Sequence, residues 1–383
     1  MHFIAIDNYI WFPILFSFFL IFSLKLGYFF NINYRVSLLL YLWHTVFCLL
    51  YFWFALTFGA DSNKYYFRAL NDPFVEINLG TSFIVLLTRF LHDFLGLGFL
   101  DQFLIHGFIG YIGLLAFAGA IKQAIQDKTR TIKLLGWLLV FLPSVSFWTS
   151  GLGKDAISFM SIGLVLWAAL DFKNRKFLLF FAIICMFIVR PHIAVVILIA
   201  FIFSLIFDKR INIYSKVFFG IFSLTGAAII LPIMLNYIGL EDANDLSDVD
   251  SYVDKRQNSN LSGGSSLDLT SMSLPTQMMT YLFRPLPFEA STVFALLASL
   301  DNVILLILTI MGLFSFINRN TPSIDSNRIF LWVYFFICLS VLAMTTANLG
   351  IAMRQKWMFV PVFIFLLLST IGSKAKKYKG VIH

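Results

Sequence analysis

Repeated long apolar stretches limit what this chain of 383 residues can fold into. Residues 9–30 carry a single charge and residues 36–58 carry none. About 20 mostly apolar residues in a helix are enough to cross the hydrocarbon layer of a bilayer. We therefore predict an all-α, polytopic integral membrane protein with about eleven transmembrane helices, near 9–30, 36–58, 98–121, 134–150, 155–171, 177–190, 192–207, 217–239, 291–317, 329–347 and 357–373.

The composition agrees with a lipid-embedded chain. Hydrophobic residues make up 60% of it and charged residues only 13%, whereas a soluble protein carries about 25% charged residues. No polar stretch is long enough for a separate soluble domain, so residues 1–383 are predicted to form one membrane domain. The three cysteines lie inside apolar runs without metal-ligand spacing, which implies neither a disulfide framework nor a zinc site.

The basic residues predict the orientation. One set of alternate loops holds 17 of the 28 lysines and arginines: Arg35, Lys122, Lys128, Arg130, Lys133, Lys173, Arg175, Lys176, Lys209, Arg210, Lys216, Arg319, Arg328, Lys374, Lys376, Lys377 and Lys379. Basic residues concentrate in cytoplasmic loops. We therefore expect the N-terminus outside and the C-terminus in the cytoplasm. This asymmetry also accounts for the net charge of +8 without nucleic acid.

Two long segments are then extracytoplasmic. Residues 59–97 are predicted to include an amphipathic or re-entrant helix at 81–97; the alternative, another full span there, would invert everything upstream. Residues 240–289 form the second long loop, and its acidic first half is predicted to be mobile because it shows no helical period.

An aspartate follows the second span directly, in Gly59-Ala60-Asp61-Ser62-Asn63-Lys64-Tyr65-Tyr66. Asp61 would lie at the outer surface, where a carboxylate with a tuned pKa can act as a general base. The alternative is a solvated residue that caps a short helix.

A second polar point is Lys154-Asp155, at the predicted start of the fifth span after two glycines. A helix N-terminus favours anions, and Lys154 would add charge there. The alternative is that these two side chains pair with each other, or with neighbouring charges, and only fix the turn.

Arginines mark three further breaks: Arg190-Pro191-His192, the stretch from Arg284 to Glu289, and Arg354 with Lys356. Arginine can hold phosphate through two parallel hydrogen bonds, although each could instead reach toward lipid headgroups. With the predicted topology these residues share one side of the membrane with Asp61 and Lys154, which suggests a binding site for a large anion. His44 and His106, inside spans, are interpreted as core residues rather than metal ligands.

The order of these features resembles a known family. The outward Gly-x-Asp-x3-Tyr-Tyr ending at Tyr66, the segment Ser150–Ala156 and the segment Gly350–Lys356 are similar to motifs of EpsG-like and Wzy-type bacterial polymerases of O-antigen, capsule or exopolysaccharide. Those proteins are related in architecture to multi-span GT-C glycosyltransferases. The resemblance covers most of the chain in layout but only short motifs in residues, and Phe58 stands where the family has a basic residue.

The resemblance implies a polysaccharide polymerase of the bacterial inner membrane. The donor would be an undecaprenyl-diphosphate-linked glycan and the acceptor a second lipid-linked repeat unit. Asp61, or else Glu289, would be the base. The diphosphate would bind Lys154, Arg190, Arg284 and Arg354, and the sugars would contact Tyr65, Tyr66, Asp155, His192 and Lys356. No cofactor is expected, although a divalent metal is compatible. Partners would be the bilayer, a chain-length regulator and a flippase, with no nucleic acid. The alternative function is a transporter or flippase for the same lipid-linked sugar.

Overall fold

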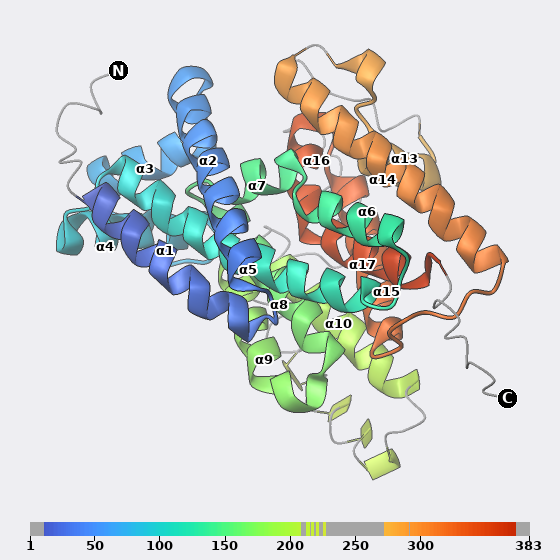
Figure 1. Ribbon diagram of the computed structural model, residues 1–383. Coiled ribbons are helices and arrows are strands. Elements are labelled where there is room, and N and C mark those ends of the chain that lie inside the picture. Colours follow the sequence, from blue (N-terminus) through green and yellow to red (C-terminus); the bar gives the residue numbers. More distant parts are fainter. Residues whose placement is uncertain are drawn as a thin grey trace, which may run out of the picture.

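The computed structural model describes residues 11–207, 212–214, 216–217, 220–221, 225–226, 272–290 and 292–372 (Figure 1). Within these ranges the chain is helical and no strand is assigned, as the sequence predicts. The elements are α1 (Trp11–Phe29), α2 (Tyr34–Phe58), α3 (Asp61–Asn71), α4 (Thr81–Leu95), α5 (Phe99–Ile125), α6 (Arg130–Val140), α7 (Pro143–Thr149), α8 (Lys154–Leu170), α9 (Phe172–Val189), α10 (Pro191–Phe207), α13 (Leu274–Phe283), η1 (Pro287–Glu289), α14 (Val293–Ile317), α15 (Arg328–Thr345), α16 (Leu349–Gln355), η2 (Lys356–Met358) and α17 (Val360–Thr370).

Six of the described helices are long and apolar enough to cross a membrane, so the chain is a multi-pass membrane protein. They are Trp11–Phe29, Tyr34–Phe58, Phe99–Ile125, Arg130–Thr149 (α6 and α7 taken together), Ala295–Ile317 (most of α14) and Arg328–Thr345. A seventh is the pair Leu349–Met358 and Val360–Thr370, which is bent by 61°.

The predicted number of eleven spans is not confirmed. The spans expected at 155–171 and 192–207 correspond to α8 and α10, which have 17 residues each, at the lower end of the usual transmembrane length, and are not among the six. The span expected at 177–190 lies in α9, whose helical geometry is interrupted at Arg175. The span expected at 217–239 lies mostly outside the described residues.

Helices α5 and α8 form the centre of the bundle. Every residue of α8 from Ala156 to Leu170 is buried. Close contact of the two helices depends on glycine, because a Cβ on Gly163 would lie 2.5 Å from the Gly113 carbonyl oxygen. Small residues let helix backbones approach closely in membrane proteins. The two helices thus pack closely, and α8 begins with Lys154 and Asp155, two of the predicted site residues.

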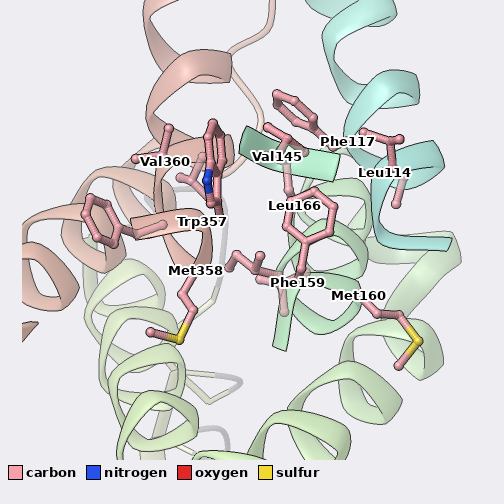
Figure 2. Packing of buried hydrophobic residues seen from close by; sticks show 14 of the residues in the cluster. Leu114, Phe117, Val145, Phe159, Met160, Leu166, Trp357, Met358 and Val360 are labelled. Carbon is pink, nitrogen blue, oxygen red and sulfur yellow. The ribbon is translucent and has the colours of Figure 1, made fainter. Parts of the chain in front are cut away.

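The C-terminal helices pack onto this centre. Figure 2 shows Trp357, Met358 and Val360, from the bend between η2 and α17, among the same buried cluster as Phe159 and Leu166 of α8. In Figure 1 the N-terminal helices (blue and cyan) and the C-terminal helices (orange and red) lie on opposite sides of the molecule. Residues far apart in the sequence therefore meet over α8.

The two ends of α8 have different chemistry. At its C-terminal end Asn327 Nδ2 donates to Ala169 O at 2.7 Å, and nearby Lys128 Nζ donates to Ser369 O at 3.1 Å. We call this end of α8 the basic end, because it lies near loops that carry lysines and arginines of the predicted cytoplasmic set. Lys154 and Asp155 lie at the other end, the site end, about 25 Å away along a helix with a rise of 1.5 Å per residue.

The two predicted long segments are partly helical. Residues 59–97 contain α3 and α4; α4 has 15 residues, about 22 Å of helix, which is short of the roughly 30 Å hydrocarbon layer. The alternative of a full span there is therefore not supported. The segment 240–289 contains α13 and η1. Its acidic first half, 241–254, lies outside the described residues.

Candidate functional site

Two aspartates and two arginines from four parts of the chain form one ion-pair network. Arg354 Nη2 lies 2.8 Å from Asp61 Oδ2, and Arg354 Nε lies 2.6 Å from Asp155 Oδ2. Arg190 Nη2 lies 2.5 Å from Asp155 Oδ1. Arg190 Nε also donates to Ser158 Oγ at 3.2 Å. Asp155 is thus held by both arginines, and Arg354 bridges both carboxylates.

Chain breaks place the two central residues of the network. Arg190 lies between α9 and α10, where Pro191 lacks the N–H that a continuous helix would need. Asp155 is in the first turn of α8, which begins at Lys154 directly after Gly153, and the Gly153 φ of 149° is unfavourable for any other residue. Gly151 leaves room for the ring of Tyr51, since a Cβ there would lie 1.9 Å from Tyr51 Cε1.

Asp61 and Arg354 approach from opposite ends of the sequence. Asp61 is the first residue of α3, and the N-cap, Ala60, makes no side-chain hydrogen bond. Asp61 thus follows the capping position, and its carboxylate pairs with Arg354. Arg354 lies in the last turn of α16, whose N-terminus is capped by Asn348 through bonds from Gly350 N and Ile351 N.

Lys154 flanks the network. Its Nζ donates to Thr81 Oγ1 at 3.1 Å, which ties the start of α8 to the start of α4. Burial, together with the nearby charge of Arg190, lowers the pKa of Lys154 to about 8. The ammonium is thus held close to other cations, which makes this end of α8 attractive to an anion. Asp155 pairs with the arginines and not with Lys154, so of the two forms of the alternative the structure shows the pairing with neighbouring charges.

A cavity of about 610 Å³ opens beside Asp61 and Arg354. Its walls combine aromatic rings with polar side chains, the usual make-up of a small-molecule site. They are Tyr51, Phe54, Phe58, Gly59, Ala60, Asp61, Asn63, Lys64, Trp148, Asn348, Gly350, Ile351 and Arg354. A second, apolar pocket of about 190 Å³ between α2, α7 and α14 shares the wall residue Trp148 with it.

The charge on Asp61 is set by opposing effects. Burial raises the pKa of this carboxyl, but the charge of Arg354 and the hydrogen bond from it, with smaller contributions from Lys64 and Lys154, bring the pKa below its usual value. Asp61 is therefore ionised at neutral pH and held by a cation. Its side chain remains 38% exposed, whereas that of Asp155 is 14% exposed.

The structure places Arg284 and Glu289 in a separate pair. Arg284 Nη2 lies 2.6 Å from Glu289 Oε1, and Leu286 N donates to Glu289 Oε2 at 2.8 Å. Burial raises the pKa of Glu289, but the bond from Arg284 outweighs it and the pKa lies below the usual value. Neither residue lines the cavity. Of the predicted diphosphate ligands, Arg354 is in the cavity wall, whereas Arg190 belongs to the network beside it and Lys154 flanks that network.

Lys356 is also directed away from the cavity. Its side chain is 1% exposed and its Nζ donates to Asn302 Oδ1, while Asn302 Nδ2 donates to Pro285 O at 2.9 Å. In the same helix as Asn302, Asp301 accepts a bond from Ser144 N at 3.1 Å. These contacts join α14 to η2 and to the start of α7, so Lys356 supports the wall behind Arg354.

The remaining predicted ligands are near the network but not in the cavity wall. Tyr65 and Tyr66 are buried, at 7% and 6% exposure; Tyr66 packs on Phe99. Burial, and next the charge of Asp61, raise the pKa of Tyr65. His192 is half-buried in the first turn of α10.

His44 and His106 are both buried inside helices, in keeping with the interpretation as core residues. Among the described residues, no group of three or more His, Cys, Asp or Glu side chains is arranged to hold a metal ion.

The sequence analysis missed several residues of the cavity and of the ion-pair network. Lys64 lies 3.8 Å from Asp61 Oδ1, three positions along α3, and this i,i+3 spacing after the aspartate was the signal for it. Ser158 lies one helical turn beyond Lys154 and could have been found in the same way. Asn348 and the aromatic wall gave no local signal, because they meet only through the tertiary fold.

No protein-family model, curated protein or solved structure matches this chain.

Proposed function

We propose that this protein polymerises undecaprenyl-diphosphate-linked oligosaccharide repeat units on the outer face of the bacterial inner membrane. The observation that carries the proposal is the Asp61–Arg354–Asp155–Arg190 network beside a cavity of about 610 Å³. It combines, in one place, a carboxylate that reaches the cavity and arginines suited to a diphosphate. The Lys154 ammonium adds positive charge at the same helix N-terminus.

The reaction requires a base and a stabilised leaving group. The acceptor hydroxyl oxygen forms a bond to the anomeric carbon of the donor sugar, and the bond from that carbon to the diphosphate oxygen breaks. The diphosphate leaves with the bonding electron pair, and Asp61 takes the hydroxyl proton. Arg354, Arg190 and Lys154 stabilise the negative charge that develops on the leaving group, which is commonly the largest electrostatic contribution to catalysis.

The cavity walls fit the two other parts of such a substrate. Tyr51, Phe54 and Trp148 offer flat apolar surfaces, and Asn63 and Asn348 offer hydrogen-bonding groups, which together suit sugar rings. The apolar pocket beyond Trp148 suits the hydrocarbon next to the diphosphate. A lipid-linked sugar needs both environments within one molecule's length, and Trp148 lies between them.

The proposal includes the arrangement in the membrane. The site end of α8 faces outward, the basic end faces the cytoplasm, and the protein acts with a flippase that supplies repeat units and with a chain-length regulator. The proposed reaction uses no cofactor, and Asp61 is its proton acceptor.

The test is a gene deletion with the surface glycan resolved by size, followed by complementation. Deletion should remove long chains and retain single repeat units, and the wild-type gene should restore the long chains. Loss of all surface glycan, including single units, would instead point to a transporter or flippase that delivers the lipid-linked sugar. Purified protein in lipid nanodiscs should then extend a lipid-linked donor without any other protein.

A further inference from the structure

The two carboxylates of the network are held in different ways. Both oxygens of Asp155 are engaged, one by Arg190 and one by Arg354, and the Arg190 side chain is only 7% exposed. Asp61 has one arginine contact, through Oδ2, and a 3.8 Å contact from Oδ1 to Lys64, whose side chain is 79% exposed. The carboxylate that can leave its arginine with little cost is therefore Asp61.

The Arg354 guanidinium makes one contact toward the protein interior and another toward the cavity wall. Its Nε contacts the buried Asp155 at 2.6 Å, while its Nη2 contacts Asp61, which lines the cavity. Because Asp155 holds Nε, an anion that binds Arg354 through two parallel hydrogen bonds must use the edge formed by Nη1 and Nη2. The anion and Asp61 therefore compete for the same nitrogen.

The charges of the cluster favour this exchange. Lys64, Lys154, Arg190 and Arg354 are cationic, and Asp61 and Asp155 are anionic, so the six side chains have an excess of two positive charges. A diphosphate diester is a dianion and would neutralise this excess. The ion pair that it breaks is partly solvated, and such pairs contribute little by themselves, about 0–1 kcal/mol.

We propose that the anionic donor displaces Asp61 from Arg354, so that donor binding itself frees the base, while Asp155 stays in place as the positioning residue that holds both arginines. This inference rests on the proposed function. Without the donor, Asp61 is occupied by Arg354 and is a poor proton acceptor. Once the donor is bound, Asp61 keeps its partly buried position but loses the cation that stabilised its charge. Proton transfer from the acceptor thus follows donor binding, which limits reaction of the site with water.

The role of Asp61 as a competitor makes a prediction of opposite sign for the two aspartates. Asp61→Asn removes the competitor, so inorganic diphosphate should bind about two- to fivefold more tightly than to the wild type, the upper part of the range expected for a partly exposed ion pair. Asp155→Asn removes the residue that orients both arginines, so diphosphate should bind more weakly. A general effect of negative charge would tighten binding in both variants, because Asp155 is as close to Arg354 as Asp61 is.

The experiment measures diphosphate binding by calorimetry on the full chain in nanodiscs. Asp72→Asn is the matched control: Asp72 follows α3, pairs with Arg68 at 3.4 Å and should change the affinity little. Thermal denaturation verifies that each variant is folded. If Asp155→Asn does not fold, Asp61→Asn alone decides, since weaker or unchanged binding in that variant contradicts the exchange.

Kinetics give a second measurement. With the lipid-linked donor, Asp61→Asn should lower both kcat and the donor KM, a combination that a purely structural defect does not produce. A raised donor KM would show that Asp61 assists donor binding and would overturn the exchange while leaving the polymerase intact. If the wild type binds no diphosphate at all, the anion site and the proposed function both fail, which distinguishes the two results.

Discussion

The Arg354 guanidinium lies 2.8 Å from the Asp61 carboxylate, although 293 residues separate them in the sequence. This contact joins the N-terminal part of the chain to the C-terminal part, because Asp61 begins α3 shortly after α2, and Arg354 lies in the last turn of α16 before the bend into α17. It also places a carboxylate and a guanidinium on the wall of one cavity. The predictions below test the parts of this arrangement separately.

Replacing Asp61 with Asn should reduce polymerisation about 10²–10⁴-fold, the usual contribution of a general base. The amide retains the shape of the side chain but cannot accept the acceptor proton. Chain length and initial rate with purified protein and a defined lipid-linked donor provide the measurement. Glu289→Gln is the control, and it should stay within a few-fold of the wild type because Glu289 pairs with Arg284 away from the cavity. The reverse pattern would make Glu289 the base.

Arg190→Ala should abolish polymerisation and also lower stability. Removing one partner of a buried ion pair costs about 3–5 kcal/mol because the other charge remains without compensation, and the Arg190 and Asp155 side chains are 7% and 14% exposed. The double variant Arg190→Met with Asp155→Leu should recover only part of the stability, because Arg354 then loses its contact with Asp155, and none of the activity. Thermal unfolding in detergent and the polymerisation assay measure the two effects. An active Arg190→Ala variant would remove this arginine from the diphosphate site.

Gly163→Ala should destabilise the bundle. Its Cβ would lie 2.5 Å from the Gly113 carbonyl oxygen, so α5 and α8 would have to move apart at a cost of about 1–3 kcal/mol for overpacking. The unfolding temperature in detergent should fall. Gly220→Ala is a matched change, since a Cβ there meets no atom of the described residues within 4 Å, and it should leave the unfolding temperature unchanged or slightly higher. Equal effects of the two substitutions would show that α5–α8 contact does not depend on Gly163.

Cysteine labelling tests the orientation. In a background without the three native cysteines, Lys64→Cys at the site end should react with a membrane-impermeant thiol reagent in intact cells. Asp127→Cys, which is exposed in the loop between α5 and α6 at the basic end, should react only after the cells are opened. Both positions are at the surface, so access alone separates them. Labelling of Asp127→Cys from outside would invert the orientation and contradict the proposed site of polymerisation.

Apolar length determined the class of the protein, because a helix that pairs all its backbone groups internally is the natural way for such stretches to enter lipid. Local sequence also determined where the chain breaks: Pro143 begins α7, Arg190 separates α9 from α10, and Lys154 begins α8. These features depend on residues close together in the chain. For the same reason, the sequence identified Asp61, Asp155, Arg190 and Arg354 as unusual charges at the ends of helices.

Which of these charges meet was decided only by the tertiary structure. From the sequence alone, Arg284, Lys356 and Glu289 could not be distinguished from Arg190 and Arg354 as site residues. All five are charged residues near the ends of apolar stretches. The packing of α14 against η2 and α7 buries Lys356 beside Asn302, and the short turn after α13 lets Arg284 bind Glu289. Packing also decided what surrounds α8, because its apolar residues from Ala156 to Leu170 are buried against other helices. Contacts between distant segments depend on how all the helices between them pack, and a local sequence pattern does not predict that packing.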